Sequence, residues 1–377
     1  MSTFCKYYKE VKQVSYDSGQ TWENLDEYRK GDLYESDSVD CGGGITQYRW
    51  VNVSGQYTCV GTTKYQKTKK QQSTDGGNTW SDVSPIEYST GAVIEYNSSD
   101  CGQSYSSQYL TFVATESGTF SFSGNDISYS LDSGTTWNTL ASGANSPTVS
   151  SGNKIMWKAT ITPTGSRIGK FSSTKSFTVE GNVMSLLYGD NFVGQTSLSG
   201  KNYVFAFLFD SCSKLTSAEN IVLPATTLAG YCYYFMFGHC TSLTKVPKLL
   251  ATTLAVGCYC CMFAYCSSLT TVPSDMLPST TLATNCYWEM FFYCTSLTTA
   301  PELPATTLQT NCYIWMFGGC NRLNYIKCLA TNISATDCTD SWVSGVASSG
   351  TFVKASSMSS WTSGSNGIPN NWTIQNV

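Results

Sequence analysis

The sequence has few charged residues, one histidine and no long apolar run. Asp, Glu, Lys and Arg make up 13% of its 377 residues, and the formal net charge is -4. Only four residues are arginines, which argues against a nucleic-acid-binding surface. The lone histidine, His239, cannot build Cys/His zinc sites. No stretch approaches the ~18 apolar residues of a membrane span, and the start of the chain has no apolar segment after a basic one. We therefore expect neither a membrane anchor nor an export signal.

Aromatic residues and cysteine, by contrast, are abundant. Tyr, Trp and Phe reach 14%, and together with many Ser, Thr, Gly and Asn residues they are typical of a β-rich chain with many turns. Thirteen of the 17 cysteines lie from Cys212 onward, most of them at two fixed positions of a repeat. Because a residue that recurs once per repeat forms a ladder along a stack, we predict buried free thiols and folding in a reducing compartment. Disulfides are the alternative.

One phrase recurs between Cys212 and Cys338. It opens with Cys-x-x-Leu, runs through a segment of variable length to Thr-Thr-Leu, and reaches Met-Phe shortly before the next copy. The copies begin at Cys212, Cys240, Cys266, Cys294 and Cys320, so the period alternates between 28 and 26 residues. A fixed period with insertion at one place predicts a solenoid, in which each repeat buries its apolar residues against its neighbours.

The centre of each copy, Phe-x-x-Cys-x-x-Leu, resembles the BspA-like branch of leucine-rich repeats. The phrase occurs at Phe237–Leu243, Phe263–Leu269, Phe291–Leu297 and Phe317–Leu323. This resemblance implies short strands that stack as a parallel sheet, over residues 243–246, 269–272, 297–300 and 323–326. Leu-Pro-Ala-Thr-Thr-Leu stands where the family usually has Ile-Pro-x-x-Val, so the second side of each coil is less predictable.

Three segments share the pattern Ser-x-Asp-x-Gly-x-Thr-Trp and resemble the Asp-box of sialidases and related β-propellers. Their defining residues are Asp17, Gly19, Trp22, Asp75, Gly77, Trp80, Asp132, Gly134 and Trp137. We expect the Asp carboxylate to accept backbone N–H groups, Gly to take a positive φ, and Trp to cover the turn. Asp-boxes of that family lie away from the active site, so the resemblance implies a structural role.

These patterns divide a mainly β chain into four parts. We predict tandem small β modules over residues 1–105, a β-sandwich over 106–182, the solenoid over 183–338 and a C-terminal cap over 339–377. Within the first part, residues 47–53 and 57–63 are expected to form two strands around a turn at Ser54-Gly55. The sandwich is predicted from alternating segments at residues 109–113, 119–122, 154–158 and 175–179.

Two pairs of positions vary among the repeats, one before Met-Phe and one after that Phe, and several of them carry aromatic side chains. The candidate adhesive residues are Phe235, Tyr265, Trp288, Phe292, Tyr293 and Trp315. Aromatic side chains gathered on a regular frame can stack on sugars or anchor a protein partner. The alternative is that several of them pack between coils or against the neighbouring domain.

The sequence contains no nucleophile–base pair, phosphate-binding Gly loop or metal cluster, so we expect no enzyme, metal or cofactor. The combination of parts is similar to surface-displayed proteins of gut Bacteroidales and of their tailed phages, crAss-like ones included. This resemblance suggests a structural virion protein, a head or tail fibre or decoration, that displays the repeats for adhesion to a host glycan or protein. Its N-terminal modules would bind other virion proteins, and homo-oligomers are expected. A bacterial cell-surface adhesin is the alternative, and a carbohydrate-active enzyme is a remote one.

Overall fold

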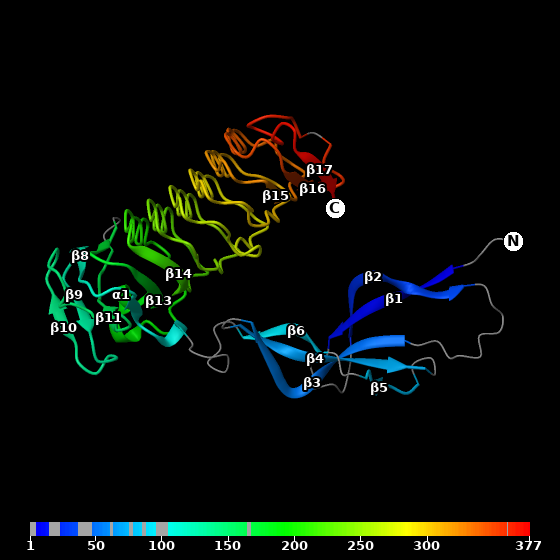
Figure 1. Cartoon of the computed structure of the whole chain (residues 1–377), viewed down its shortest axis with the longest axis horizontal. Helices are drawn as coiled ribbons and strands as arrows, with labels where there is room; N and C mark the ends of the chain where they lie inside the picture. Colours follow the sequence, from blue (N-terminus) through cyan, green and yellow to red (C-terminus); the bar gives the residue numbers. More distant parts are fainter. Residues whose placement is uncertain are drawn as a thin grey trace. The chain divides into compact units, whose positions relative to one another are not determined.

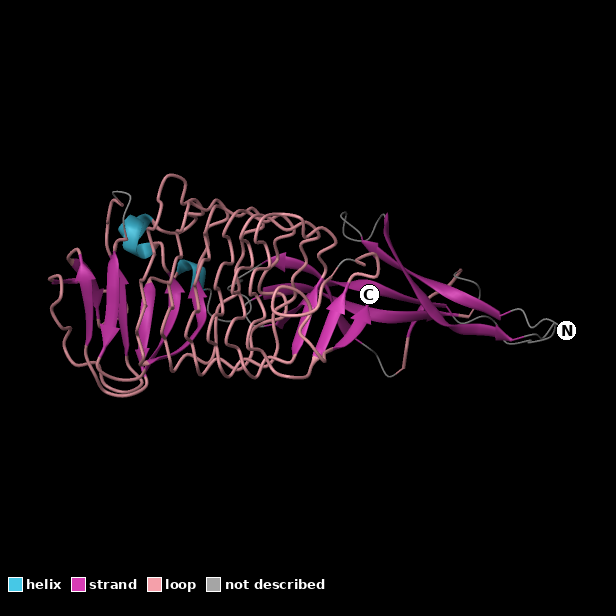
Figure 2. Ribbon diagram, turned by 90° about the horizontal axis from the view of Figure 1, so that it is seen from above, coloured by secondary structure: helices cyan, strands magenta, loops and turns pink. Residues whose placement is uncertain are grey.

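The computed structural model describes residues 5–14, 23–36, 47–60, 63–74, 78–84, 88–95, 105–163, 167–359 and 361–377. The chain divides into two compact units, Met1–Ser104 and Tyr105–Val377. Both are mainly β, as the composition predicts. Among the described residues, helical structure is confined to α1 (Ser185–Tyr188) and the short 3-10 turns η2 (Tyr105–Ser107) and η3 (Gly189–Asn191) (Figure 2).

The described residues of the N-terminal unit form two antiparallel sheets. In one of them β1 (Cys5–Val14) pairs with β2 (Glu23–Ser36). In the other, β4 (Thr63–Ser73) pairs with β3 (Gln47–Val60), β5 (Ser81–Asp82) and β6 (Tyr88–Glu95).

The predicted turn at Ser54-Gly55 is wrong, because β3 runs straight through it. The pairing of β3 with β4 jumps from Asn52–Thr68 to Tyr57–Gln66. Four residues of β3 therefore oppose a single residue of β4, so the extra residues are absorbed as a bulge within one strand.

The C-terminal unit begins with a six-stranded sheet covered by a two-stranded one. The six-stranded sheet has the order β10-β9-β11-β7-β13-β14, and β8 pairs with β12. The strands are β7 (Leu110–Ala114), β8 (Phe120–Gly124), β9 (Ile127–Ser130), β10 (Asn138–Leu140), β11 (Lys154–Lys158), β12 (Gly169–Ser173), β13 (Phe177–Asn182) and β14 (Leu215–Val222). Aromatic rings fill the space between the two sheets. The centroid of Phe112 lies 4.8 Å from that of Phe171 and 5.5 Å from that of Trp157.

The six-stranded sheet continues directly into the repeats. Strand β14 belongs to the first repeat and pairs in parallel with β13. One hydrophobic core runs from Leu110 to Trp372, so the predicted borders at residues 182 and 338 lie inside a single compact unit.

The repeats stack side by side (Figure 1), and two kinds of backbone hydrogen bond hold their turns. Between repeats, the N–H of Phe237 donates to Met262 O at 2.9 Å; within one turn segment, the N–H of Cys240 donates to Phe237 O at 3.2 Å. The two kinds alternate along each segment of tight turns. Every fourth residue takes a left-handed conformation, as at Tyr231, Phe235 and His239, with φ of 53°, 50° and 56°. Such a conformation costs a non-glycine residue roughly 1–2 kcal/mol, which the bonds between repeats offset.

Regular parallel strands form in only some of the repeats. Strand β15 (Tyr325–Cys328) overlaps the predicted segment 323–326. It pairs with β16 (Thr351–Lys354), which in turn pairs with β17 (Thr373–Asn376). Continuous strands at 243–246, 269–272 and 297–300 are wrong; isolated bridges such as Ser217–Lys245 and Thr299–Tyr325 occur there. Each of these three segments is followed by a proline, Pro247, Pro273 or Pro301, which has no N–H to donate. The repeats with β14 and β15 have no proline at that place.

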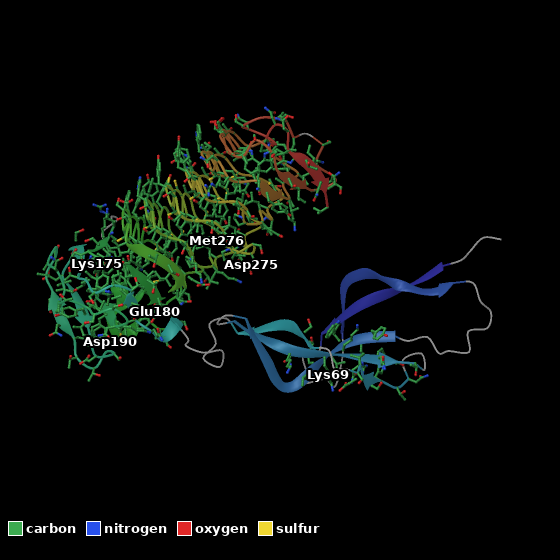
Figure 3. The ribbon with its side chains drawn as sticks, viewed as in Figure 1. Lys69, Lys175, Glu180, Asp190, Asp275 and Met276 are labelled. Carbon is green, nitrogen blue, oxygen red and sulfur yellow. The ribbon has the colours of Figure 1, made fainter. Side chains whose placement is uncertain are left out.

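The segment of variable length makes its own contacts with the neighbouring repeat, through Asp275 and Met276, which Figure 3 labels. In the third copy Met276 is fully buried, and the neighbouring Asp275 accepts a salt bridge from Lys248 of the preceding copy at 2.7 Å.

The tail beyond residue 339 keeps the stacking although its sequence loses the repeat. There the rings of Trp342 and Trp361 stack at a centroid distance of 5.6 Å.

Candidate functional site

Two columns of aromatic rings form the interior of the stacked repeats. Consecutive members of the Phe column lie 5.3 to 5.8 Å apart and nearly parallel: Phe209, Phe237, Phe263, Phe291 and Phe317. A Tyr column runs beside it through Tyr233, Tyr259, Tyr287 and Tyr313 and ends on Trp342. All of these side chains are buried, so both columns serve packing. They hold the outer side chains in register.

A thiol column stands beside the Phe column. The Sγ of Cys240 donates to the carbonyl oxygen of Phe209 in the preceding repeat at 3.1 Å. The same bond recurs at Cys212, Cys266, Cys294 and Cys320, at 3.0 to 3.2 Å. All thirteen cysteines from Cys212 onward are buried and free, as the spacing predicts. Burial raises the pKa of Cys212 and of Cys320 to about 12, so both are protonated thiols at neutral pH.

The structure brings the candidate adhesive residues together outside this core. Phe235, Tyr265, Trp288 and Phe292 pack with Tyr231 and Tyr234 around buried Cys260, Cys261 and Ala264. We call this group the outer aromatic cluster. These rings are partly buried, so part of their surface goes into contacts between neighbouring repeats. Tyr293 is the most exposed of the six, at 48%.

A ladder of stacked rings runs along the outer side. Centroids of consecutive rings lie 4.6 to 5.8 Å apart with interplanar angles of 17° or less, through Phe207, Phe235, His239, Tyr265 and Tyr293. Trp315 is partly buried, and its ring meets that of Phe292 edge-on at 5.7 Å. We call this series the outer ring ladder. The spacing is regular because most consecutive rings stand at equivalent positions of neighbouring repeats. Phe235 and His239 instead lie on adjacent turns of the same segment.

His239 belongs to this ladder, which the sequence analysis did not predict. Its Nδ1 lies 2.9 Å from Oδ1 of Asp210, whose Oδ2 accepts a salt bridge from Lys170 at 3.1 Å. The carboxylate therefore fixes the plane of the imidazole between Phe235 and Tyr265. One feature of the sequence could have indicated this contact. Asp210 lies one repeat, 28 residues, before Gly238, and Gly238 is the chain neighbour of His239.

Cys260 and Cys261 form a close pair beneath the outer aromatic cluster. Their Sγ atoms lie 3.4 Å apart, and Cys261 Sγ donates to Oε2 of Glu289 at 3.5 Å. The hydrogen bond with Cys260, together with burial, raises the pKa of Cys261 well above its usual range. Cys261 is therefore a thiol, and the pair supports the surrounding rings.

The third Asp-box lies in the six-stranded sheet, away from the outer ring ladder. Asp132 Oδ1 accepts the backbone N–H of Thr136 at 2.8 Å, and Trp137 Nε1 donates to Gly134 O at 3.1 Å. Gly134 has φ of 88°. The hydrogen bonds from Thr136 lower the pKa of Asp132 to about 2. Every polar contact of the carboxylate thus goes to its own turn.

The other two boxes lie wholly or partly outside the described residues. Asp17, Gly19 and Trp22 lie outside them, as do Asp75 and Gly77. Trp80 is described, and the guanidinium carbon of Arg49 sits 4.2 Å from its ring centroid.

The described residues include no group of three or more His, Cys, Asp and Glu side chains suited to a metal ion. A helix of the length and apolarity needed to cross the bilayer does not occur in the part of the chain that the structure describes. Comparisons with protein-family models, with curated proteins and with solved structures give no match.

Proposed function

We propose that this chain is a structural protein of a tailed-phage particle that displays an adhesive surface towards its host. In this proposal the stacked repeats are a solenoid of the BspA-like leucine-rich type, and the outer ring ladder with the outer aromatic cluster is the contact surface. The unit Met1–Ser104 attaches the protein to other virion proteins of the head or tail, and the protein assembles as a homo-oligomer.

The observation that carries the adhesive role is the outer ring ladder. Its rings are ordered by a rigid interior of stacked Phe and Tyr columns, and Tyr293 offers about half of its surface to solvent. Aromatic side chains on a preorganised frame lose little conformational entropy when they bind, which makes them efficient anchors. Interior packing alone does not account for a second, outer ladder of rings.

The thiols support assembly in a reducing compartment, such as the cytoplasm of an infected cell. Each thiol of the thiol column is buried and donates to a main-chain carbonyl. A disulfide would remove that donor. Free cysteines in such number are typical of proteins that fold under reducing conditions.

The proposal is tested on purified phage particles. Mass spectrometry should find the chain among the particle proteins, and antibody against the full chain should block adsorption to host cells. Absence of the chain from particles sinks the proposal. Its presence on intact uninfected cells would instead favour the bacterial adhesin.

A further inference from the structure

The outer ring ladder ends abruptly at Tyr293. In the two repeats that follow, the position equivalent to Tyr293 is occupied by Gly319 and then Gly345, with φ of 76° and 74°. One face of Tyr293 stacks on Tyr265 at a centroid distance of 5.6 Å. A Cβ on Gly319 would meet Cδ2 of Tyr293 at 2.9 Å, so the tyrosine ring leans over the glycine. The Tyr293 ring therefore covers Gly319, and no further ring follows it at this position of the repeats.

A second aromatic side chain borders the same place. The ring of Trp315 covers Gly318, since a Cβ there would lie 2.5 Å from Cε3 of Trp315. In the following repeat the position equivalent to Trp315 is Ser341. The outer surface thus changes from rings to small polar residues within one repeat.

The polar residues beyond the step are fixed by bonds to one another. Asn366 Nδ2 donates to Asp340 Oδ1 at 3.0 Å, and Ser341 Oγ donates to the same oxygen at 3.3 Å. The backbone N–H of Ser341 donates to Asn366 Oδ1 at 2.8 Å. Both bonds to Asp340 end on Oδ1, which leaves Oδ2 to accept from a bound molecule. The group is a preorganised set of hydrogen-bonding partners one repeat beyond the exposed Tyr293 and the partly buried Trp315.

We propose that this step is a subsite for one pyranose ring of an uncharged glycan. The apolar face of the sugar packs against the exposed parts of the Tyr293 and Trp315 rings, and its hydroxyl groups bond to Asp340, Ser341 and Asn366. This inference rests on the proposed adhesive function and names its ligand.

The chemistry of the step favours a sugar over an aromatic side chain of a protein partner. A sugar hydroxyl both donates and accepts, so it can satisfy a carboxylate and a serine together. A partner phenyl ring would bury Asp340 with no donor for Oδ2, which is costly. The carboxylates of Asp337 and Asp340, three residues apart in one repeat, disfavour acidic sugars.

The test is a glycan array probed with the full-length chain. It carries neutral oligosaccharides of glucose, galactose, mannose and N-acetylglucosamine, together with sialylated and sulfated ones. Three variants are compared with the unmodified protein: Tyr293→Ala, Asp340→Asn and Tyr203→Ala. Tyr203 is the matched control, because it is 38% exposed and stacks on Tyr231 at 5.0 Å at the far end of the repeats.

We expect binding to a neutral glycan that Tyr293→Ala and Asp340→Asn each weaken at least tenfold and that Tyr203→Ala leaves unchanged. Circular dichroism of each variant checks the fold, and Asp340→Asn keeps the side-chain size if Tyr293→Ala is unstable. Absence of array binding overturns the subsite, as does preference for acidic glycans or equal loss in all three variants.

Phage adsorption separates this inference from the proposed function. Particles that carry Asp340→Asn and still adsorb normally, while antibody against the chain blocks adsorption, would overturn the subsite and leave the adhesive function standing. Particles that lack the chain altogether would remove the adhesive function even where the array shows sugar binding.

Discussion

The thiol of Cys266 donates to the carbonyl oxygen of Phe237 in the preceding repeat, at a distance of 3.2 Å. That oxygen also accepts the backbone N–H of Cys240 at 3.2 Å. The cysteine therefore links the turn segment of one repeat to that of the next, and it does so as a thiol. This explains why the residue recurs without forming disulfides.

Replacing Cys266 by alanine should destabilise the protein by about 1–3 kcal/mol, because a hydrogen bond and buried volume are lost together. Chemical denaturation followed by circular dichroism measures the change. Cys260→Ala is the control, since its Sγ contacts another thiol and no main-chain carbonyl. Equal losses in the two variants would show that the carbonyl bond contributes nothing.

Alkaline pH should destabilise the C-terminal unit. Burial raises the pKa of Cys212, Cys232 and Cys286 from 9.0 to about 12. The folded state thus holds protons that the unfolded state releases above pH 9, and stability falls as pH rises from 9 towards 12. Each such thiol contributes up to about 1.4 kcal/mol per pH unit in that window. Thermal melts between pH 7 and 11 should be flat below pH 8 and then decline; a flat curve to pH 11 contradicts this.

Alanine at Gly319 should cost more stability than alanine at Gly143. The two glycines have nearly the same φ, 76° and 77°, so the backbone strain of about 1 kcal/mol is shared. Only at Gly319 does the added Cβ meet a ring, that of Tyr293, whereas Gly143 has nothing within 4 Å. The difference in melting temperature isolates the contact with Tyr293. Identical shifts would mean that the tyrosine moves aside freely.

Asp132→Ala should loosen the third Asp-box and leave adhesion intact. The pKa of Asp132 is lowered to about 2 by hydrogen bonds from Thr136, so the charged form stabilises the turn above pH 3.8 and the benefit is lost as pH falls towards 2. Faster amide hydrogen exchange at Thr136 is the expected readout. Trp137→Phe, which removes the bond to Gly134 O and alters the ring contacts with Tyr109 and Lys158, should have a smaller effect on exchange at Thr136. A loss of glycan binding in Asp132→Ala would contradict the structural role.

Local patterns in the sequence predicted those parts of the fold that depend on local chemistry. Alternating residues marked the segments that became β7 and β11 to within about one residue; β11 buries one face, whereas β7 is buried on both. The spacing of Cys212 and its equivalents predicted the buried thiols. The continuous strand that the resemblance implies at residues 243–246 does not form. Pro247, which follows it, has no N–H to donate, and the family phrase takes no account of this residue.

The candidate site could be located from sequence but not resolved in detail. Variable aromatic positions pointed to Tyr265, Tyr293 and Trp315, which do lie on the outer side. Most left-handed residues of the turns, Phe235 among them, are not glycines, so residue type alone did not indicate the turns. The pairing of Asp210 with His239 spans two repeats and depends on their alignment in space.

The bonds between repeats also have a mechanical consequence. Main-chain bonds such as Tyr233 N to Cys258 O and Phe237 N to Met262 O join each repeat to the next, at 3.0 and 2.9 Å. Tension applied along the stack would act on all of these bonded interfaces, and they would break one repeat at a time. Each repeat that peels away would release roughly 90 Å of chain. A protein anchored at one end and bound to a partner at the other would thus lengthen in steps when a force pulls the two ends apart.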